Sequence, residues 1–131
     1  MKLLLDTHVL LWGLLEPERL SRRTALELED PDNELWLSPV SAWEIAVLAE
    51  KGRISIEDPD PGKWLRKVLS CAPLREAPLN LEVALQSRSV DLRHQDPANR
   101  FIAATALVYD LVLVTADRRL LESEQVRTLP A

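Results

Sequence analysis

The sequence predicts an α/β fold in which a parallel sheet is covered by helices on both faces. Short apolar runs alternate along the chain with longer segments of helical periodicity, and this alternation is typical of βαβ units. The chain has 131 residues, 47% of them hydrophobic, which suits a single domain spanning residues 1–131. A domain of this size buries roughly two thirds of the surface of its unfolded chain, so its core needs no disulfide or metal.

Five short apolar runs are the strand candidates, and they predict a sheet of about five strands. The stronger three cover residues 2–5, 35–37 and 111–114, and the weaker two cover residues 77–79 and 126–129. A polar residue follows each of the stronger runs. Val112 and Val114 add the β-branched character that favours a strand.

Helical patterns fill the segments between these runs. They cover residues 24–29, 41–51, 63–69, 81–89, 97–109 and 118–122, and a further helix contains residues 9–14. Ile45 and Leu48 fall at helical spacing, and Gly52 follows them as a C-cap. The segment 97–109 is rich in small apolar residues, which suits close packing on a sheet.

Composition excludes several kinds of site. Glycine occurs three times, so neither a Rossmann nor a Walker nucleotide-binding loop can be assembled. The one cysteine, Cys71, rules out a disulfide framework, and His8 and His94 cannot complete a zinc site with it. The formal net charge of −5 argues against indiscriminate coating of nucleic acid.

The chain also shows no targeting or membrane-spanning segment. The apolar start of the chain meets Asp6 too early for a secretory signal. No apolar run approaches the roughly 18 residues that cross a bilayer. We therefore expect a cytoplasmic protein that makes no membrane contact.

Acidic residues follow the predicted strands and open the next helices. Asp6 follows the first strand, Glu44 lies in the first turn of the helix after the second, and Asp117 follows the strand at residues 111–114. Asp96 opens the helix at residues 97–109. Ligands of open parallel sheets bind at the carboxyl ends of the strands, so these acids should converge there. Clustered carboxylates favour a hard cation such as Mg²⁺ or Mn²⁺, which supports phosphoryl chemistry.

Each of these acids also has a purely structural interpretation. Asp6, Asp96 and Asp117 could be helix N-caps, because each directly precedes a predicted helix. Glu44 could bond back to Ser41 in a capping box. Acids are in any case favoured at helix N-termini by the helix dipole. The pattern alone leaves both interpretations open.

Four sequence blocks, in order, resemble the PIN domain and in particular the VapC family of toxin ribonucleases. They are Leu5-Asp6-Thr7-His8-Val9-Leu10-Leu11-Trp12, Ser38-Pro39-Val40-Ser41-Ala42-Trp43-Glu44-Ile45, His94-Gln95-Asp96-Pro97-Ala98-Asn99-Arg100-Phe101 with the apolar residues after it, and Leu113-Val114-Thr115-Ala116-Asp117-Arg118-Arg119-Leu120. Each block alone is a weak match, whereas the four at this spacing are specific. The resemblance covers nearly the whole chain.

The resemblance implies a three-layer α/β/α fold and Mg²⁺- or Mn²⁺-dependent cleavage of RNA. It also implies a homodimer and inhibition by a small VapB-type antitoxin. Asp6 matches the first acid of the family site, Glu44 the second and Asp117 the last. Thr115 matches the hydroxyl residue two positions before the last acid, and Thr7 is expected in a supporting role.

The chain departs from the family pattern at Asn99. In the pattern Asp-Pro-x-Asp-Arg, the second acid usually faces the metal, and here that position holds an asparagine. An asparagine offers a carbonyl oxygen to a cation but no charge, so the site should bind its metal more weakly. Asp96 lies three positions earlier, on the same face of a helix start, and is our candidate substitute ligand and catalytic acid.

Arginines beside the acid blocks are candidates for contact with RNA phosphates. The candidates are Arg93, Arg100, Arg118 and Arg119. Their alternative role is a solvated surface or salt bridges to an antitoxin, and His94 is interpreted as a loop or capping residue. The four tryptophans lie in apolar patterns that indicate core or dimer packing, so no aromatic platform for bases is visible.

Three other functions compete with a working nuclease. A PIN module weakened by Asn99 would bind antitoxin or RNA without efficient cleavage. A phosphoacceptor domain of the response-regulator kind also clusters acids at strand ends, but it needs a lysine near Thr115, where this chain has Arg118 and Arg119. A small-molecule phosphatase is a third alternative, for which no substrate pocket is marked.

Overall fold

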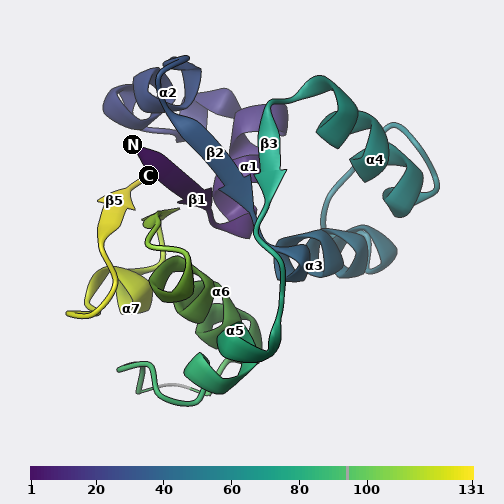
Figure 1. The fold of residues 1–131 in the computed structure, drawn as a ribbon. Helices are drawn as coiled ribbons and strands as arrows, with labels where there is room; N and C mark the ends of the chain where they lie inside the picture. Colours follow the sequence, from purple (N-terminus) through teal and green to yellow (C-terminus); the bar gives the residue numbers. More distant parts are fainter. Residues whose placement is uncertain (94) are drawn as a thin grey trace.

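Five parallel strands form the central sheet of the computed structural model, which describes residues 1–93 and 95–131 (Figure 1). His94 and its expected loop or capping role lie outside the described residues. The strands are β1 (Lys2–Leu5), β2 (Glu34–Leu37), β3 (Leu74–Glu76), β4 (Val112–Thr115) and β5 (Thr128–Pro130), in the spatial order β3-β2-β1-β4-β5. All four strand pairs are parallel, which confirms the predicted α/β class.

The predicted strand at residues 77–79 is wrong, because the edge strand β3 ends just before it. The amide of Ala77 still donates to the carbonyl of Leu37 at 2.9 Å. The partner strand β2 ends at Leu37, and Pro39 has no N–H to donate to the carbonyl of Ala77, so the ladder stops there. The strand forms instead from the three residues that precede Ala77 and follow the preceding helix.

Helices connect the strands, and each α-helix begins at a side-chain cap, whereas the 3₁₀ helix has none. They are α1 (Thr7–Leu15), the 3₁₀ helix η1 (Pro17–Arg19), α2 (Arg22–Glu29), α3 (Pro39–Glu50), α4 (Pro61–Cys71), α5 (Leu81–Gln86), α6 (Pro97–Val108) and α7 (Arg118–Leu121). Asp6, Asp96 and Asp117 accept backbone hydrogen bonds at the starts of α1, α6 and α7, as the structural interpretation of these acids predicted. No helix in the described part of the chain has the length and apolarity to cross a bilayer.

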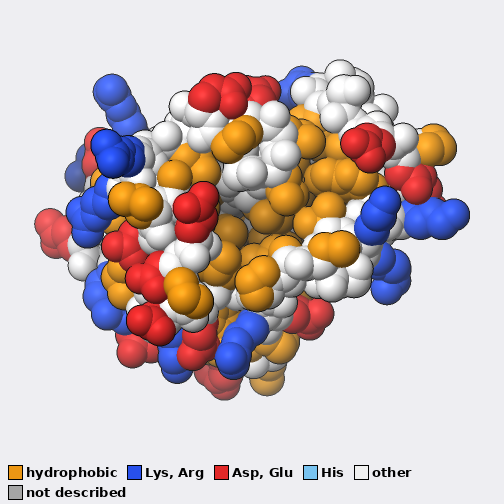
Figure 2. Space-filling view, turned by 90° about the horizontal axis from the view of Figure 1, so that it is seen from above, with side chains coloured by type: hydrophobic (Ala, Val, Ile, Leu, Met, Phe, Trp, Pro, Cys, Tyr) orange, Lys and Arg blue, Asp and Glu red, His pale blue; other side chains and the backbone are white. Residues whose placement is uncertain are grey.

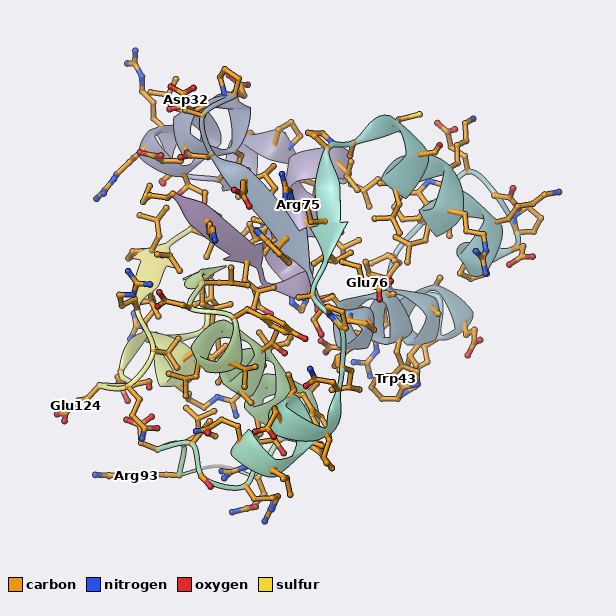
Figure 3. All side chains as sticks on the ribbon, in the orientation of Figure 1. Asp32, Trp43, Arg75, Glu76, Arg93 and Glu124 are labelled. Atoms are coloured by element: carbon orange, nitrogen blue, oxygen red, sulfur yellow. The ribbon has the colours of Figure 1, made fainter. Side chains whose placement is uncertain are left out.

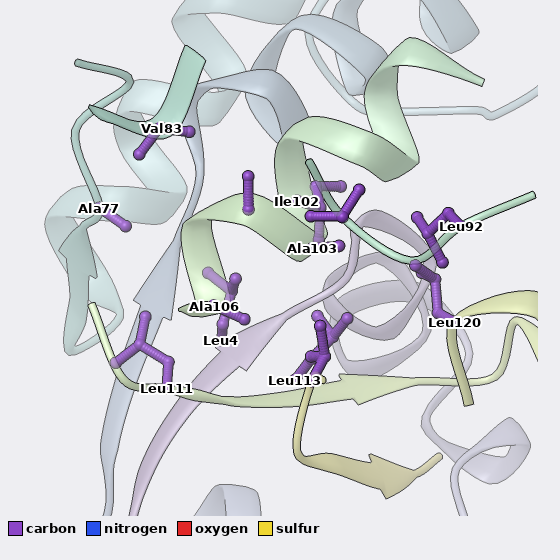
Figure 4. Close-up of a cluster of buried hydrophobic side chains, with 13 residues drawn as sticks. Leu4, Ala77, Val83, Leu92, Ile102, Ala103, Ala106, Leu111, Leu113 and Leu120 are labelled. Atoms are coloured by element: carbon purple, nitrogen blue, oxygen red, sulfur yellow. The ribbon is translucent and has the colours of Figure 1, made fainter. Parts of the chain in front are cut away.

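Two apolar layers pack on opposite faces of the sheet. Leu4 belongs to one layer with Ile102 of α6, while Leu3 and Leu5 belong to the other with Ile45 of α3. Successive residues of a strand point to opposite faces, which explains why β1 contributes to both. Figure 4 shows the first layer, and Figure 1 shows α5, α6 and α7 together on that side of the sheet. This is the predicted three-layer arrangement.

The order of the strands places a topological switch point at the carboxyl ends of β1 and β4. From β1 the chain moves outward through β2 to β3, then returns to lay β4 on the other side of β1. Ligands of open α/β sheets bind where the strand order reverses in this way. The fold therefore brings the residues after β1 and β4 together at the position where a site is expected.

Candidate active site

Asp6 ends β1 and is held at both carboxylate oxygens. Its Oδ1 accepts a hydrogen bond from the amide of Thr7 at 2.8 Å, and its Oδ2 accepts one from Thr115 Oγ1 at 2.7 Å. Only 7% of Asp6 is exposed. The side chain is thus both a helix cap and a fixed carboxylate at the switch point, and the two interpretations of this acid hold together.

Thr115 joins Asp6 to Asp117. Its hydroxyl donates to Asp6 and accepts from the amide of Asp117 at 3.0 Å. The pairing of β1 with β4 sets this geometry, since the amide of Asp6 donates to the carbonyl of Val114 at 3.0 Å. Thr115 is fully buried, so the bridge lies at the base of the site.

Glu44 reaches the site from α3, through a bond that the sequence analysis missed. Thr7 Oγ1 donates to Glu44 Oε1 at 2.7 Å and also contacts Ser41 Oγ at 3.0 Å. The capping-box interpretation of Glu44 is wrong, because α3 begins at Pro39 and its cap is Ser38. Thr7, the residue after Asp6, therefore has a direct role in the site, because its hydroxyl holds the carboxylate of Glu44. No sequence spacing signals this contact, because the start of α1 and the first turn of α3 meet only in the tertiary structure.

Asn99 binds Asp117 by hydrogen bonding. Its Nδ2 donates to Asp117 Oδ2 at 3.0 Å, and it is almost fully buried at the start of α6. A carboxylate accepts and does not donate, so the amide nitrogen must face Asp117. In this arrangement Asn99 holds the last acid in place, rather than adding a further negative charge beside it.

Arg119 also binds Asp117, through a contact that the sequence analysis did not foresee. Its Nη2 donates to Asp117 Oδ2 at 3.1 Å and its Nε to Asp117 Oδ1 at 3.3 Å. The amide of Arg119 donates to the same Oδ1 at 2.8 Å. The sequence carries a signal for this ion pair: the N-cap of α7 is Asp117, and the second residue of the helix is Arg119.

Asp96 stands at the rim of the site as the cap of α6. Its Oδ1 accepts from the amides of Ala98 and Asn99 at 3.0 and 3.3 Å. The residue is exposed, and its charge contributes to raising the pKa of Glu44. The structure thus places Asp96 within the electrostatic field of the site and engages one of its oxygens in capping.

The pKa values of the three acids are pushed in different directions. Burial raises the pKa of Asp6, against the hydrogen bonds from Thr115 and Thr7, and the charge of Asp117 raises it further. Burial likewise raises the pKa of Glu44, helped by the charge of Asp6. Burial also opposes ionisation of Asp117, but hydrogen bonds from Arg119 and Asn99 outweigh it, and the pKa of Asp117 is lowered. Acids with divergent pKa values in one cluster are typical of catalytic sites.

The oxygen donors of the site suit a hard divalent cation, although the acids do not form a complete ligand set. Carboxylate and amide oxygens dominate the site, and a cation would offset the desolvation cost of Asp6. Within residues 1–93 and 95–131, no three acidic, histidine or cysteine side chains are close enough together to hold a metal ion. Asp6 and Asp117, joined through the Thr115 hydroxyl, are the acids that could share such an ion, and Arg119 would then have to release Asp117.

The four candidate RNA-contact arginines lie in different surroundings. Arg100 is buried, and its guanidinium donates to backbone carbonyls of Ser87 and Leu92, so the expected RNA contact is replaced by an internal one. Arg93 and Arg118 are exposed, and Arg119 is half exposed while bound to Asp117. Of the four, Arg93, Arg118 and Arg119 are at the surface, and Arg119 contacts an acid of the site.

Comparison with known proteins decides the family. Residues 3–124 match the model of the PIN domain. The chain belongs to the PIN domain family. It is 37% identical over 119 residues to Ribonuclease VapC22 of Mycobacterium tuberculosis, a match that covers 89% of this chain and 88% of that protein. The VapC resemblance predicted from the four sequence blocks is thereby confirmed.

Solved structures share the PIN fold over the full chain. The VapBC2 complex of Rickettsia felis, bound to a promoter DNA fragment, contains a chain that matches with a TM-score of 0.75 and 16% identity, covering 100% of this chain and 99% of that one. The DNA-bound VapBC of Salmonella typhimurium matches with a TM-score of 0.68 and 19% identity, covering 99% and 98%. At these identities the likeness concerns the fold.

The desolvation of Asp6 predicts that the site lowers the stability of the PIN fold. We expect Asp6→Asn to raise the free energy of unfolding by about 1 kcal/mol at neutral pH without metal, because a neutral amide avoids burying a charge. The gain should shrink as the pH falls, since a raised pKa lets folded Asp6 take up its proton before the unfolded chain does. Denaturant unfolding of both proteins across this pH range measures it. Equal stabilities at neutral pH, or an equal gain in the exposed Asp32→Asn control, would contradict the prediction.

Proposed function

We propose that this protein is a metal-dependent endoribonuclease, the toxin of a VapBC-type toxin-antitoxin pair. The observation that carries the proposal is the pair of carboxylates, Asp6 and Asp117, joined through the Thr115 hydroxyl where the strand order reverses. The 37% identity to a VapC ribonuclease supports RNA as the substrate. PIN family membership supports a divalent metal, for which Mg²⁺ and Mn²⁺ are the candidates.

The residues of the site divide the work of phosphodiester cleavage. Asp6 and Asp117 would hold the ion, with Asn99 or Asp96 as candidate further ligands through their side-chain oxygens. A bound Mg²⁺ or Mn²⁺ supplies Lewis-acid polarisation of the phosphate and activation of water. Glu44 is held by Thr7, and burial raises its pKa, which makes the ionised carboxylate a stronger base; it would accept a proton from the attacking water. Thr115 fixes Asp6 and orients Asp117 through its amide.

Arg118 and Arg119 support the same function from the start of α7. Both follow Asp117 directly, and a cation on Asp117 would weaken the hold of that carboxylate on the Arg119 guanidinium. A guanidinium beside the acids can then offset the charge of an RNA phosphate.

Metal-dependent RNA cleavage is the direct test of this proposal. Purified protein should cut a panel of structured RNAs that includes tRNA in the presence of Mn²⁺ or Mg²⁺, and EDTA should abolish the cutting. We expect Asp6→Asn to lower the cleavage rate by about a hundredfold or more, because the ion loses its central charged ligand. The Asp32→Asn control removes an exposed carboxylate far along the chain and should cut normally. RNA cleavage at the native rate in EDTA, or in Asp6→Asn, would contradict the proposal.

The alternative function is a PIN module that binds antitoxin or RNA with little cleavage. The observation that favours it is Asn99, which stands where the family pattern has an acid and donates to Asp117 instead. The same side chain can be regarded as a working part of the site, because it lowers the pKa of Asp117 and keeps that acid charged.

Restoring the acid at position 99 separates these two functions. We expect Asn99→Asp to tighten Mn²⁺ binding by about tenfold, through an added charge worth about 1.4 kcal/mol. Without metal the same change should lower the unfolding temperature, because two carboxylates would face each other where a hydrogen bond now lies. Calorimetric metal titration and thermal unfolding measure both effects. Cleavage that rises by orders of magnitude would favour the weakened module, whereas an unchanged rate would show that Asn99 suffices.

An antitoxin partner belongs to the proposed function, and an apolar cavity between α1 and α4 is where we place it. The cavity has a volume of about 620 Å³, and Leu14, Trp64 and Val68 contribute apolar side chains to it. Figure 2 shows hydrophobic side chains gathered in a hollow of one face, with acidic and basic side chains around it. The similar folds solved as VapBC complexes support this assignment of a partner.

A charged residue in this cavity should block the antitoxin. We expect Leu14→Glu to weaken antitoxin binding by about a hundredfold, since a carboxylate would be buried without a partner in the complex. Leu14 is 40% exposed in the free chain, so the variant should keep its fold and its RNA cleavage. Co-purification with the antitoxin of the same operon and a binding isotherm measure the effect. Unchanged affinity would place the antitoxin elsewhere.

The homodimer implied by the VapC resemblance is also part of the proposal. Trp43 is 62% exposed and projects outward from α3, beside an apolar cavity of about 330 Å³ that it shares with Val40, Leu79 and Phe101 (Figure 3). A protruding ring next to a cavity in one patch is the self-complementary shape that a two-fold interface requires. The molar mass in solution, before and after Trp43→Ser, checks this arrangement.

A further inference from the structure

The segment between α5 and α6 is fixed from inside by a buried arginine. Arg100 lies on α6, one residue after Asn99, and only 5% of it is exposed. Its Nε donates to the carbonyl of Ser87 at 2.9 Å and its Nη1 to the carbonyl of Leu92 at 2.8 Å. A planar guanidinium that spans two points of a loop holds them at a set distance. The chain that leads to Arg93 is therefore braced against the helix that carries Asn99.

Asp91 lies within the same segment and ties it to a second loop. Asp91 Oδ1 accepts from Ser123 Oγ at 2.5 Å, and its Oδ2 accepts from the amide of Glu124 at 2.9 Å. The amide of Asp91 donates to Gln125 Oε1 at 2.9 Å. Three hydrogen bonds thus join this loop to the connection between α7 and β5. The two loops form one rim beside the start of α7.

A polar cavity of about 520 Å³ lies between these loops. Its charged lining consists of Arg93 and Asp91 from the first loop, Arg119 from α7, and Glu122 and Glu124 from the second loop; both carboxylate oxygens of Asp91 already accept hydrogen bonds. Figure 3 shows the labelled side chains of Arg93 and Glu124 projecting on the same side of the molecule. Arg119 also binds Asp117, so the cavity begins one side chain away from the candidate active site.

We propose that this cavity is a substrate subsite, in which Arg93 and Arg119 bind a backbone phosphate of the RNA strand next to the phosphate that is cut. The inference rests on the proposed nuclease function and adds to it the path of the strand. Arginine matches phosphate through paired N–H donors, and Arg93 and Arg119 come to the cavity from different elements. Because the braces by Arg100 and Asp91 keep the Arg93 loop in place, little entropy is lost when the phosphate is bound.

The cavity contains charges of both signs, so the proposal predicts the direction in which each substitution changes RNA affinity. Glu124 repels a phosphate in this cavity, whereas Arg93 attracts it. Neutralising each residue should therefore change RNA affinity in opposite directions, which general loosening of the loop would not do. Glu124 contributes its backbone amide to the brace, so Glu124→Gln leaves that hydrogen bond intact.

The experiment compares Arg93→Gln and Glu124→Gln with native protein on two substrates. One substrate is a long single-stranded RNA that can occupy the subsite, and the other is a dinucleotide that spans only the cut bond. We expect Arg93→Gln to raise KM for the long RNA by about tenfold, to lower the salt dependence of binding by about one phosphate contact, and to leave kcat unchanged. Glu124→Gln should lower the same KM, and neither variant should alter dinucleotide cleavage. Arg66→Gln, which removes an exposed arginine on α4, is the matched control and should behave as native protein.

Binding measurements keep the subsite testable apart from catalysis. Fluorescence anisotropy of labelled long RNA, with every variant carried in the Asp6→Asn background, should show the same opposite shifts. If native protein cuts no RNA but these shifts are seen, the nuclease proposal fails and the subsite stands. Equal effects of Arg93→Gln and Arg66→Gln, shifts of the same sign, or equal losses on the dinucleotide would overturn the subsite. Two further results would overturn it. One is a loss of antitoxin affinity in Arg93→Gln while RNA binding stays intact. The other is competition between inorganic phosphate and RNA that is equally strong in native protein and in Arg93→Gln.

Discussion

The hydrogen bonds of one buried hydroxyl, that of Thr115, connect the fold to the site. Thr115 ends β4, and its Oγ1 donates to Asp6 after β1 while it accepts from the amide of Asp117. This geometry exists only because β1 and β4 are neighbours, which follows from the reversal of strand order. Glu44 joins the same set through Thr7, the residue after Asp6. Two threonines thus place three acids that are far apart in the sequence.

The site is held at a cost to the stability of the free protein. Asp6 is buried beside other carboxylates, and burial and the charge of Asp117 both disfavour its ionised form. Helix capping offsets part of this cost, because Asp6 also accepts from the amide of Thr7 at the start of α1. Capping and function are therefore served by the same side chains, and the structural interpretation of an acid at a helix start does not argue against a functional one. Such local strain is expected where a bound cation or substrate supplies the missing compensation.

Asp117 is the acid of the site whose carboxylate receives side-chain hydrogen bonds from an amide and a guanidinium. Asn99 and Arg119 both donate to it, so its charge is already balanced in part before any cation or phosphate arrives. The arginine links this acid to the polar cavity under Arg93, while the asparagine lies on the helix that Arg100 braces. Asn99 and Arg119 thus connect the last acid of the site to α6 and to the polar cavity.

The sequence by itself determined the fold class, the alternation of strands and helices, and the positions of Asp6, Glu44, Asp96 and Asp117, because these depend on local periodicity and on short motifs. It misplaced β3, whose ladder stops where its partner β2 ends before Pro39, and it assigned Arg100 to the surface. Only the tertiary structure decided that Arg100 is buried against loop carbonyls, that Glu44 is held by Thr7, and that Asn99 donates to Asp117. Each of these contacts joins segments that the sheet brings together, so no spacing along the chain could reveal which side chains would face each other.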